Sequence, residues 1–88
     1  EGEFRKVEDI VNGYFDNVML HFRNEVSLPC ESDYRRVCYM FAGVSGQIIG
    51  EIMGESKDAV CQRRSRLLKK IAFLDCLHKE MFIMLLSK

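Results

Sequence analysis

The sequence lacks several features that mark particular classes of protein. It has one proline in 88 residues, with 48% hydrophobic and 30% charged side chains, which excludes a disordered chain and favours a folded one. Thirteen basic and thirteen acidic side chains give no net charge, which excludes a uniformly basic nucleic-acid binder. The longest uncharged apolar runs, residues 37–44 and 81–87, are far shorter than the roughly 20 residues that cross a bilayer. No membrane contact is therefore expected of this segment.

The length and the cysteines bound the organisation of the chain. Eighty-eight residues fit one domain with one core. The chain begins with Glu1 and has no basic, apolar and small-residue leader, so we expect a piece of a longer protein and not a secreted precursor. The four cysteines are Cys30, Cys38, Cys61 and Cys76, and they lie in apolar helical patterns. This placement favours reduced structural thiols in a cytoplasmic protein.

Apolar residues recur at helical spacing and no strand pattern is found, which predicts a single all-α domain, residues 1–88, of about five helices. A leading helix is expected over residues 1–26, because Gly13 weakens a helix by about 1 kcal/mol without ending it. His21 lies near the edge of its apolar stripe and is expected to be a half-buried core residue. Pro29 then breaks the pattern.

Serines and glycines mark the ends of the next helices. Ser32 or Asp33 is expected to cap a helix that stops at Gly43, Ser45 a second that stops at Gly54, and Ser56 a third that runs to about Phe73. Together they make a core region over residues 32–73, followed by a short helix over 76–87. Each of the three helices is expected to bury one apolar face. These faces are Val37, Cys38, Met40 and Phe41 on the first helix, Ile48, Ile49, Ile52 and Met53 on the second, and Val60, Leu67, Leu68 and Ile71 on the third.

Only Gly54, Glu55 and Ser56 separate the second and third of these helices, which predicts a helix-turn-helix whose second helix lies in a DNA major groove. That helix also carries the positive charge. Residues 56–71 hold six basic and one acidic side chain, a net of +5, whereas residues 1–55 hold five basic and ten acidic, a net of −5. With Val60, Leu67 and Ile71 facing inward, its outer face carries Asp58, Gln62, Ser65, Arg66 and Lys69, flanked by Arg63 and Lys70 on one side and by Lys57 and Cys61 on the other.

Such a face suits DNA, because short polar side chains meet base edges while long basic ones reach phosphates. The free amides that follow Ser56 are also suited to holding a phosphate. The residues expected to contact double-stranded DNA are Ser56, Lys57, Cys61, Gln62, Arg63, Ser65, Arg66, Lys69 and Lys70.

The segment 45–71 resembles the LuxR/GerE-type helix-turn-helix of bacterial transcription regulators. The matching residues are Ser45, Ile49, Gly50, Met53, Ser56, Val60, Leu67, Lys70 and Ile71. The order of helices agrees over residues 32–87, although the specific motif covers only 45–71. Region four of sigma factors shares the pattern. A weaker likeness is to the carboxy-terminal domains of Bacteroidetes-type regulators, which follow a helical-repeat sensor.

The resemblance implies a carboxy-terminal DNA-binding module with a sensor domain upstream. It places base contacts at Cys61, Gln62 and Ser65 and phosphate contacts near Ser56, Arg63 and Lys70. The chain departs from the family at several positions: Cys30, Glu31 and Tyr34 replace its opening residues, Gly50 an alanine and Ala59 a threonine. Arg64 replaces a buried aliphatic residue, so its side chain must run outward along its stem or reach a phosphate.

The residues of the basic helix also fit a function other than DNA binding. The alternative is a protein-interaction or dimerisation module that docks an acidic partner through the same basic helix. No enzyme is expected, since no nucleophile has a base beside it and Glu51 and Glu55 are expected to face solvent as a helical pair. Cys76 and His78 are two residues apart and are both metal-ligand types, but there is no Cys-x-x-Cys motif, so neither a metal site nor a cofactor is expected.

Two further hypotheses concern single features. Cys61, close to Arg63 and to the amino end of its helix, is a hypothetical redox-sensing thiol. The last helix has too many apolar residues for one face: Leu77, Met81, Phe82, Ile83, Met84, Leu85 and Leu86. This excess indicates either a homodimer contact, as the resemblance implies, or cover by the leading helix.

Overall fold

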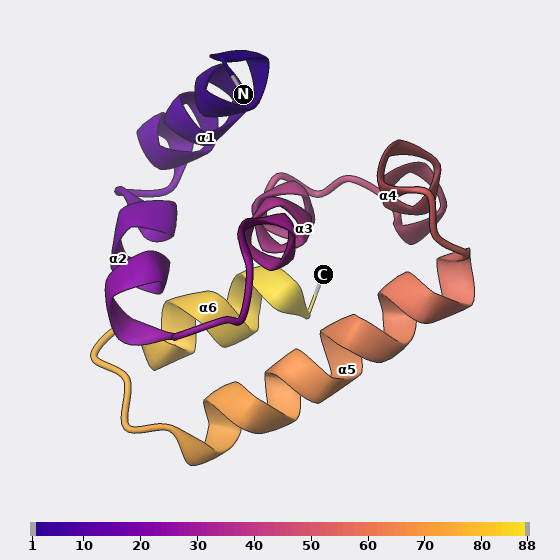
Figure 1. Ribbon diagram of the computed structural model, residues 1–88. Coiled ribbons are helices and arrows are strands. Elements are labelled where there is room, and N and C mark those ends of the chain that lie inside the picture. The colour runs from indigo at the N-terminus through magenta and orange to yellow at the C-terminus, as the bar shows by residue number, and fades with distance from the viewer. Residues whose placement is uncertain (1, 88) are drawn as a thin grey trace.

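The computed structural model describes residues 2–87, and within them every regular element is a helix. The six helices are α1 (Gly2–Tyr14), α2 (Val18–Glu25), α3 (Glu31–Phe41), α4 (Gly46–Met53), α5 (Lys57–Phe73) and α6 (Lys79–Leu86). Figure 1 shows the long α5 along one side of the bundle, with α6 beside it and α2 and α3 packed over α6. The expected all-α fold is confirmed. None of these helices is long and apolar enough to cross a membrane.

The leading segment forms two helices, so the prediction of one helix over residues 1–26 was wrong. After α1, Asp16 and Asn17 adopt left-handed backbone angles, with φ of 53° and 60°. Aspartate and asparagine enter this region more readily than other non-glycine residues. Asn12 also supports the break, because its Oδ1 accepts a hydrogen bond of 2.8 Å from the backbone N–H of Met19. Local side-chain bonding thus overrides the continuous apolar spacing.

Three phenylalanines from three helices form the centre of the core. Phe22 of α2 meets Phe41 of α3 and Phe82 of α6 edge to face, with ring centroids 5.5 and 5.2 Å apart, and Phe41 stacks on Phe82 at 6.2 Å. All three side chains are fully buried. Edge-to-face and offset aromatic pairs stabilise a core beyond the area that they bury. The leading segment therefore covers α6 through its α2 half.

Most of the apolar surface of α6 is accounted for inside the chain. Phe82, Leu85 and Leu86 are buried, whereas Leu77, before the helix, is 87% exposed and Met84 is 64% exposed. The helix begins at Lys79 and not at Cys76 as predicted. His78 lies before the helix because its backbone angles, φ −106° and ψ 31°, are not helical, and its N–H donates to the Glu25 carboxylate of α2 at 2.8 Å.

Of the six ends expected for α3, α4 and α5, five hold, including the end of α5 at Phe73. Gly43 and Gly54 are left-handed, with φ of 84° and 72°, and the Ser45 and Ser56 hydroxyls accept hydrogen bonds from the backbone N–H of Ile48 and Ala59. The cap of α3 was mispredicted. Cys30 is its N-cap in place of Ser32 or Asp33, since the first turn already closes between the Asp33 N–H and the Cys30 carbonyl.

The buried faces agree with the prediction except on α4. The four predicted residues of α3 are buried, and so are Val60, Leu67 and Ile71 of α5, with Leu68 half-buried. Of the four residues predicted for α4, only Ile49 is buried, whereas Ile48 and Ile52 are 51% and 53% exposed and Met53 is half-buried. This helix has only two turns and packs against α5 and α3 on one side, so a four-residue apolar face is too wide for it.

Candidate nucleic-acid interface

Two helices and the tight turn between them, α4 and α5, are the first feature of the candidate interface. The two axes cross steeply, with α4 seen end-on while α5 runs across the view (Figure 1). Gly54 in the left-handed region ends α4, and the backbone N–H groups of Gly54 and Glu55 both donate to the Gly50 carbonyl. Ser56 then caps α5. This is the arrangement of a helix-turn-helix.

Gly50 is the point of closest approach within this unit. A Cβ atom built on it would lie 2.4 Å from the backbone carbonyl oxygen of Glu55, which no real side chain tolerates. The turn therefore lies closer to α4 than an alanine at this position would permit. Glycine at this position sets the separation between α4 and the start of α5.

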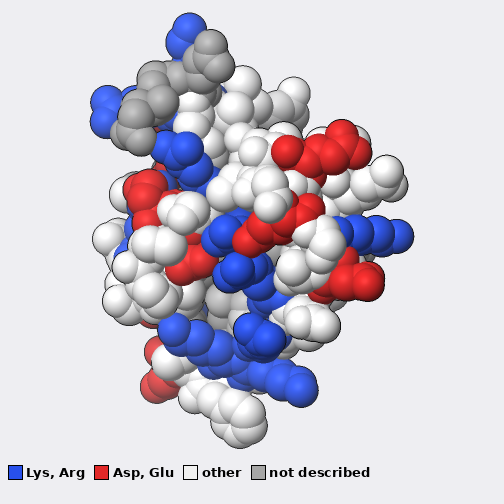
Figure 2. All heavy atoms as spheres, turned by 45° about the vertical axis from the view of Figure 1, so that its right-hand side comes forward, with Lys and Arg blue, Asp and Glu red and all other residues white. Residues whose placement is uncertain are grey.

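The outer face of α5 is exposed as predicted. Within residues 2–87, five of its polar or basic side chains make no hydrogen bond or ion pair with another residue: Lys57, Gln62, Ser65, Arg66 and Lys69. Figure 2 shows basic side chains gathered over the lower part of this face of the molecule, where α5 lies, with acidic ones among those above them. Asp58 is also exposed there.

The flank of α5 is engaged with the protein itself. Arg63 Nη2 lies 3.0 Å from a carboxylate oxygen of Glu55, and Lys70 Nζ donates to the backbone carbonyl of Ser27 at 3.0 Å. The Ser56 hydroxyl serves as the helix cap. These three residues were the expected phosphate contacts, and in this structure each already has an internal partner.

Glu55 is the centre of an ion-pair network and does not face solvent with Glu51, as was predicted. Arg36 of α3 donates to both of its carboxylate oxygens, at 2.8 and 2.9 Å, and Arg36 also binds Asp33 at 2.9 Å. The hydrogen bonds from Arg36 are the main reason that the pKa of Glu55 lies below its usual value; Arg63 adds to them and partial burial opposes them. The network fastens the turn to α3.

Two residues beside the outer face are only half-exposed. Cys61 points toward α4, since its Sγ lies 3.6 Å from the place of a Cβ on Gly46. Arg64 lines a cavity of about 400 Å³ with Met40, Leu85 and Leu86, and its Nε is buried without a hydrogen-bond partner. The apolar stem of Arg64 thus lies over the core, as expected for an arginine at a position that is aliphatic in the family resembled.

A groove of about 190 Å³ between α3 and α5 adds basic side chains to the same region. Its floor is apolar, formed by Leu28, Val37, Met40 and Leu67, and Arg36, Arg63, Arg66 and Lys70 line it beside Asp33. Of these cations, Arg66 alone has neither an ion pair nor a hydrogen bond to another residue within the described part of the chain. The groove therefore extends the basic character of α5 toward α3.

The structure also brings together a group that the sequence did not indicate. His78 was considered with Cys76, but its ring lies beside Glu25 and His21 of α2 instead. Glu25 and His78 are 53 positions apart in the sequence, so no spacing pattern connects them.

Comparison with known proteins assigns no family: no family model matches the chain, and no curated protein or solved structure matches it. The arrangement of α4, the turn and α5 is therefore the main guide to function.

Proposed function

We propose that this chain binds double-stranded DNA, with α5 in the major groove, as a module of a cytoplasmic bacterial transcription regulator whose sensor domain lies upstream. The observation that carries the proposal is the outer face of α5. Arg23, Arg36 and Arg63 each bind a carboxylate, and Arg64 lies over the core. The outer face of α5, by contrast, carries exposed side chains that are unbonded within residues 2–87: Lys57, Gln62, Ser65, Arg66 and Lys69. A helix that presents such side chains has the chemistry to read a groove.

The roles follow from the length and charge of each side chain. Gln62 and Ser65 are short and polar and lie at the centre of the face, so they meet base edges. Lys57, Arg66 and Lys69 are long and positively charged and meet phosphates. Arg63 and Lys70 join them only by exchanging an internal partner for a phosphate.

The turn supports the proposal because it fixes the angle at which α5 is presented. Gly50, the Ser56 cap and the Glu55 network hold α4 and α5 against each other and against α3. A rigid angle matters, since recognition requires the amino-terminal part of the second helix to reach the bases while the first helix lies across the backbone.

The test is binding to duplex DNA across a salt series, followed by fluorescence anisotropy, with an Arg66→Ala, Lys69→Ala double variant. Each lost phosphate contact lowers the salt slope of log K by about 0.9, so the double variant is expected to lose about two units of slope. The matched control is Arg5→Ala, Lys6→Ala, which removes two exposed cations from α1. It should bind DNA as the wild type does.

Sequence preference separates the proposal from its alternative. Base-edge contacts discriminate between duplexes by about 1 to 3 kcal/mol for each good pair, whereas a surface built for an acidic protein has no such code. Selection from random duplexes should therefore yield a preferred site that Gln62→Ala and Ser65→Ala relax. An absence of binding at low salt contradicts the proposal and favours a protein-interaction or dimerisation module.

We propose that two copies meet on DNA through the exposed apolar residues of the carboxy-terminal segment, Leu77 and Met84. A two-fold dimer would place its α5 helices about 34 Å apart, one turn of the duplex. Sedimentation equilibrium with and without an inverted-repeat duplex tests this contact. Leu77→Ser, Met84→Ser should bind a single half-site normally and lose cooperative binding to the repeat.

A further inference from the structure

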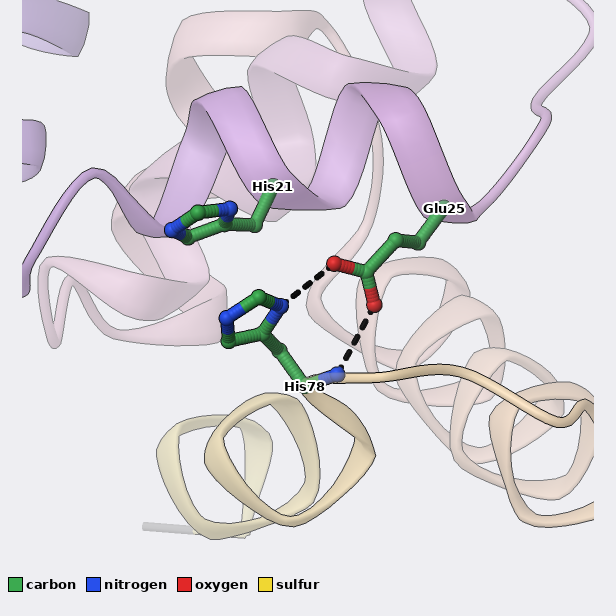
Figure 3. Close-up of side chains that lie close together, drawn as sticks. All are labelled: His21, Glu25 and His78. Atoms are coloured by element: carbon green, nitrogen blue, oxygen red, sulfur yellow. Dashed lines mark hydrogen bonds and ion pairs between the residues drawn. The ribbon is translucent and has the colours of Figure 1, made fainter.

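A cluster of three metal-ligating side chains lies where α2 meets the start of α6, outside the proposed DNA-binding face. His21 and Glu25 are four residues apart on α2, and His78 is the residue that precedes α6. Residues four apart share one face of a helix. Figure 3 shows the His78 ring between the two side chains of α2, with the Glu25 carboxylate directed toward it.

The three side chains already lie close enough to share one ion. One ligand atom from each falls within 4.8 Å of the others. Glu25 Oε2 is hydrogen-bonded to His78 Nδ1 at 2.5 Å, and the His21 and His78 rings stack with centroids 3.8 Å apart and planes 17° apart. The three ligand types are therefore near one another, although the stacked rings are not yet turned toward a common centre.

The carboxylate of Glu25 is held in place from the backbone. Its Oε1 accepts a hydrogen bond of 2.8 Å from the His78 N–H, which leaves Oε2 directed at the ring. The pKa of Glu25 is lowered: partial burial acts against this, but the hydrogen bonds from His78 and the nearby His21 outweigh it. Two imidazoles and one ionised, oriented carboxylate form the ligand set.

We propose that His21, Glu25 and His78 bind a divalent transition-metal ion of the zinc type. Two imidazole nitrogens and one carboxylate oxygen are a ligand set that Zn²⁺ takes, whereas Mg²⁺ and Ca²⁺ prefer oxygen ligands throughout. Water completes the coordination, because all three residues are only half-buried. The site uses none of the exposed side chains of α5, so it stands or falls independently of DNA binding.

Metal binding requires a defined rearrangement. Bonds of about 2.0 to 2.1 Å in a tetrahedron put neighbouring ligand atoms roughly 3.3 Å apart. Glu25 Oε2 and His78 Nδ1 must therefore separate from 2.5 Å, and the two stacked rings must tilt so that their nitrogen lone pairs converge. Before Nδ1 of His78 can bind the ion, the proton that it shares with Glu25 must leave this nitrogen, so that the neutral ring carries its proton on Nε2.

The ion would clamp two segments that are distant in the sequence. Glu25 and His78 are separated by 53 residues, and the hydrogen bonds between them already fix the start of α6 on α2. The unfolded chain does not bring the three ligands together, so an ion bound there stabilises the folded state in proportion to the logarithm of its concentration. The melting temperature should therefore rise with Zn²⁺ concentration.

The experiment is titration of the chelator-stripped chain with Zn²⁺ against a chromophoric competitor, and with Co²⁺ followed by its visible absorption. A cysteine-to-serine background at Cys30, Cys61 and Cys76, the exposed and half-buried thiols, removes competing thiolate ligands. We expect one equivalent of either ion to bind, and no binding of Mg²⁺. His21→Asn and His78→Asn should each weaken Zn²⁺ binding by at least about tenfold, since ligands matter no less than the groups that orient them.

The matched control is Asp75→Asn, which removes an exposed carboxylate three residues before His78 and should leave the affinity unchanged. Circular dichroism checks that each variant keeps its helices, and His21→Asn serves where His78→Asn disturbs the fold, because the structure gives the His21 side chain a stacking contact and no hydrogen bond. Absence of Zn²⁺ binding at micromolar concentration overturns the proposal. So does binding that both histidine variants retain.

Discussion

At the scale of single residues, the structure is shaped by a few charged side chains that bind one another instead of solvent. Glu55 lies in the turn between α4 and α5. It accepts hydrogen bonds from Arg36 of α3 and forms an ion pair with Arg63 of α5. Its side chain is 15% exposed and that of Arg36 is 12% exposed. Removing Glu55 leaves Arg36 with Asp33 as its one carboxylate partner within residues 2–87, so part of its charge loses its compensation.

Glu55→Gln is expected to lower the free energy of unfolding by about 2 kcal/mol near neutral pH, the scale of hydrogen bonds to charged groups. Thermal or urea unfolding measures the change. Glu51→Gln is the control, because Glu51 is exposed on the last helical turn of α4 and has no ion pair within residues 2–87. Equal effects of the two substitutions would contradict a structural role for the network.

Three carboxylates with lowered pKa values predict how the stability depends on pH. The pKa values of Glu25, Glu31 and Glu55 are all lowered from 4.5 in the folded chain, chiefly by hydrogen bonds from His78, Arg23 and Arg36. As the pH falls, the unfolded chain therefore takes up protons before the folded chain does. The contribution of these carboxylates to the free energy of unfolding is complete above about pH 4.5 and is lost below it. Melting temperatures should be level from about pH 7 to 5 and fall below that, less steeply in Glu55→Gln.

The thiols differ in reactivity because they differ in burial. Burial raises the pKa of Cys38 to about 12, and Cys38 is fully buried, whereas Cys30 is exposed. Since the thiolate is the reactive form, iodoacetamide at neutral pH should modify Cys30 quickly and Cys38 only after unfolding. Mass spectrometry of peptides over time measures both rates. Modification of Cys61 with DNA binding unchanged would dispose of a redox role for that residue.

At the scale of elements, the packing of α4 on the turn depends on one glycine. Substitutions of glycine by alanine in helices normally stabilise, by about 0.4 to 1 kcal/mol, through the unfolded chain. Gly50 is the exception, because the new methyl group would meet the Glu55 carbonyl oxygen at 2.4 Å. That contact is with backbone and cannot be relieved by a change of rotamer.

Gly50→Ala is expected to destabilise the chain by about 1 to 3 kcal/mol, the usual cost of overpacking. Gly13→Ala in α1 makes the same chemical change where a Cβ would meet nothing within 4 Å, and it should stabilise. Denaturant unfolding of the two variants should thus give opposite signs. Two stabilising results would show that α4 and the turn are not in close contact.

At the scale of the whole molecule, the core depends on helices from both ends of the described chain. Phe22, Phe41 and Phe82 join α2, α3 and α6, so the last helix is part of the fold and not an appendage. The charges are also arranged at this scale. Asp33 and Glu55 neutralise the Arg63 flank of α5, which leaves the net positive charge on its outer face.

Phe82→Ala is expected to cost about 3 to 5 kcal/mol, a large part of the stability of a domain this small. Phe73→Ala is the matched control, because Phe73 is 92% exposed at the end of α5 and should change stability by less than about 0.5 kcal/mol. The melting temperatures of the two variants measure the contrast.

The sequence by itself determined the helical class, the bounds of α4 and α5, their serine caps and the inner and outer faces of α5, because these depend on spacing and on hydrogen bonds to neighbours in the chain. It missed the break at Asp16 and Asn17, where an asparagine side chain redirects the backbone. Only the tertiary structure decided which cations of α5 remain free, since their partners come from α3, the turn and residue 27. It alone joined His78 to Glu25 and His21, because contact across 53 residues follows from packing and leaves no periodic trace in the sequence.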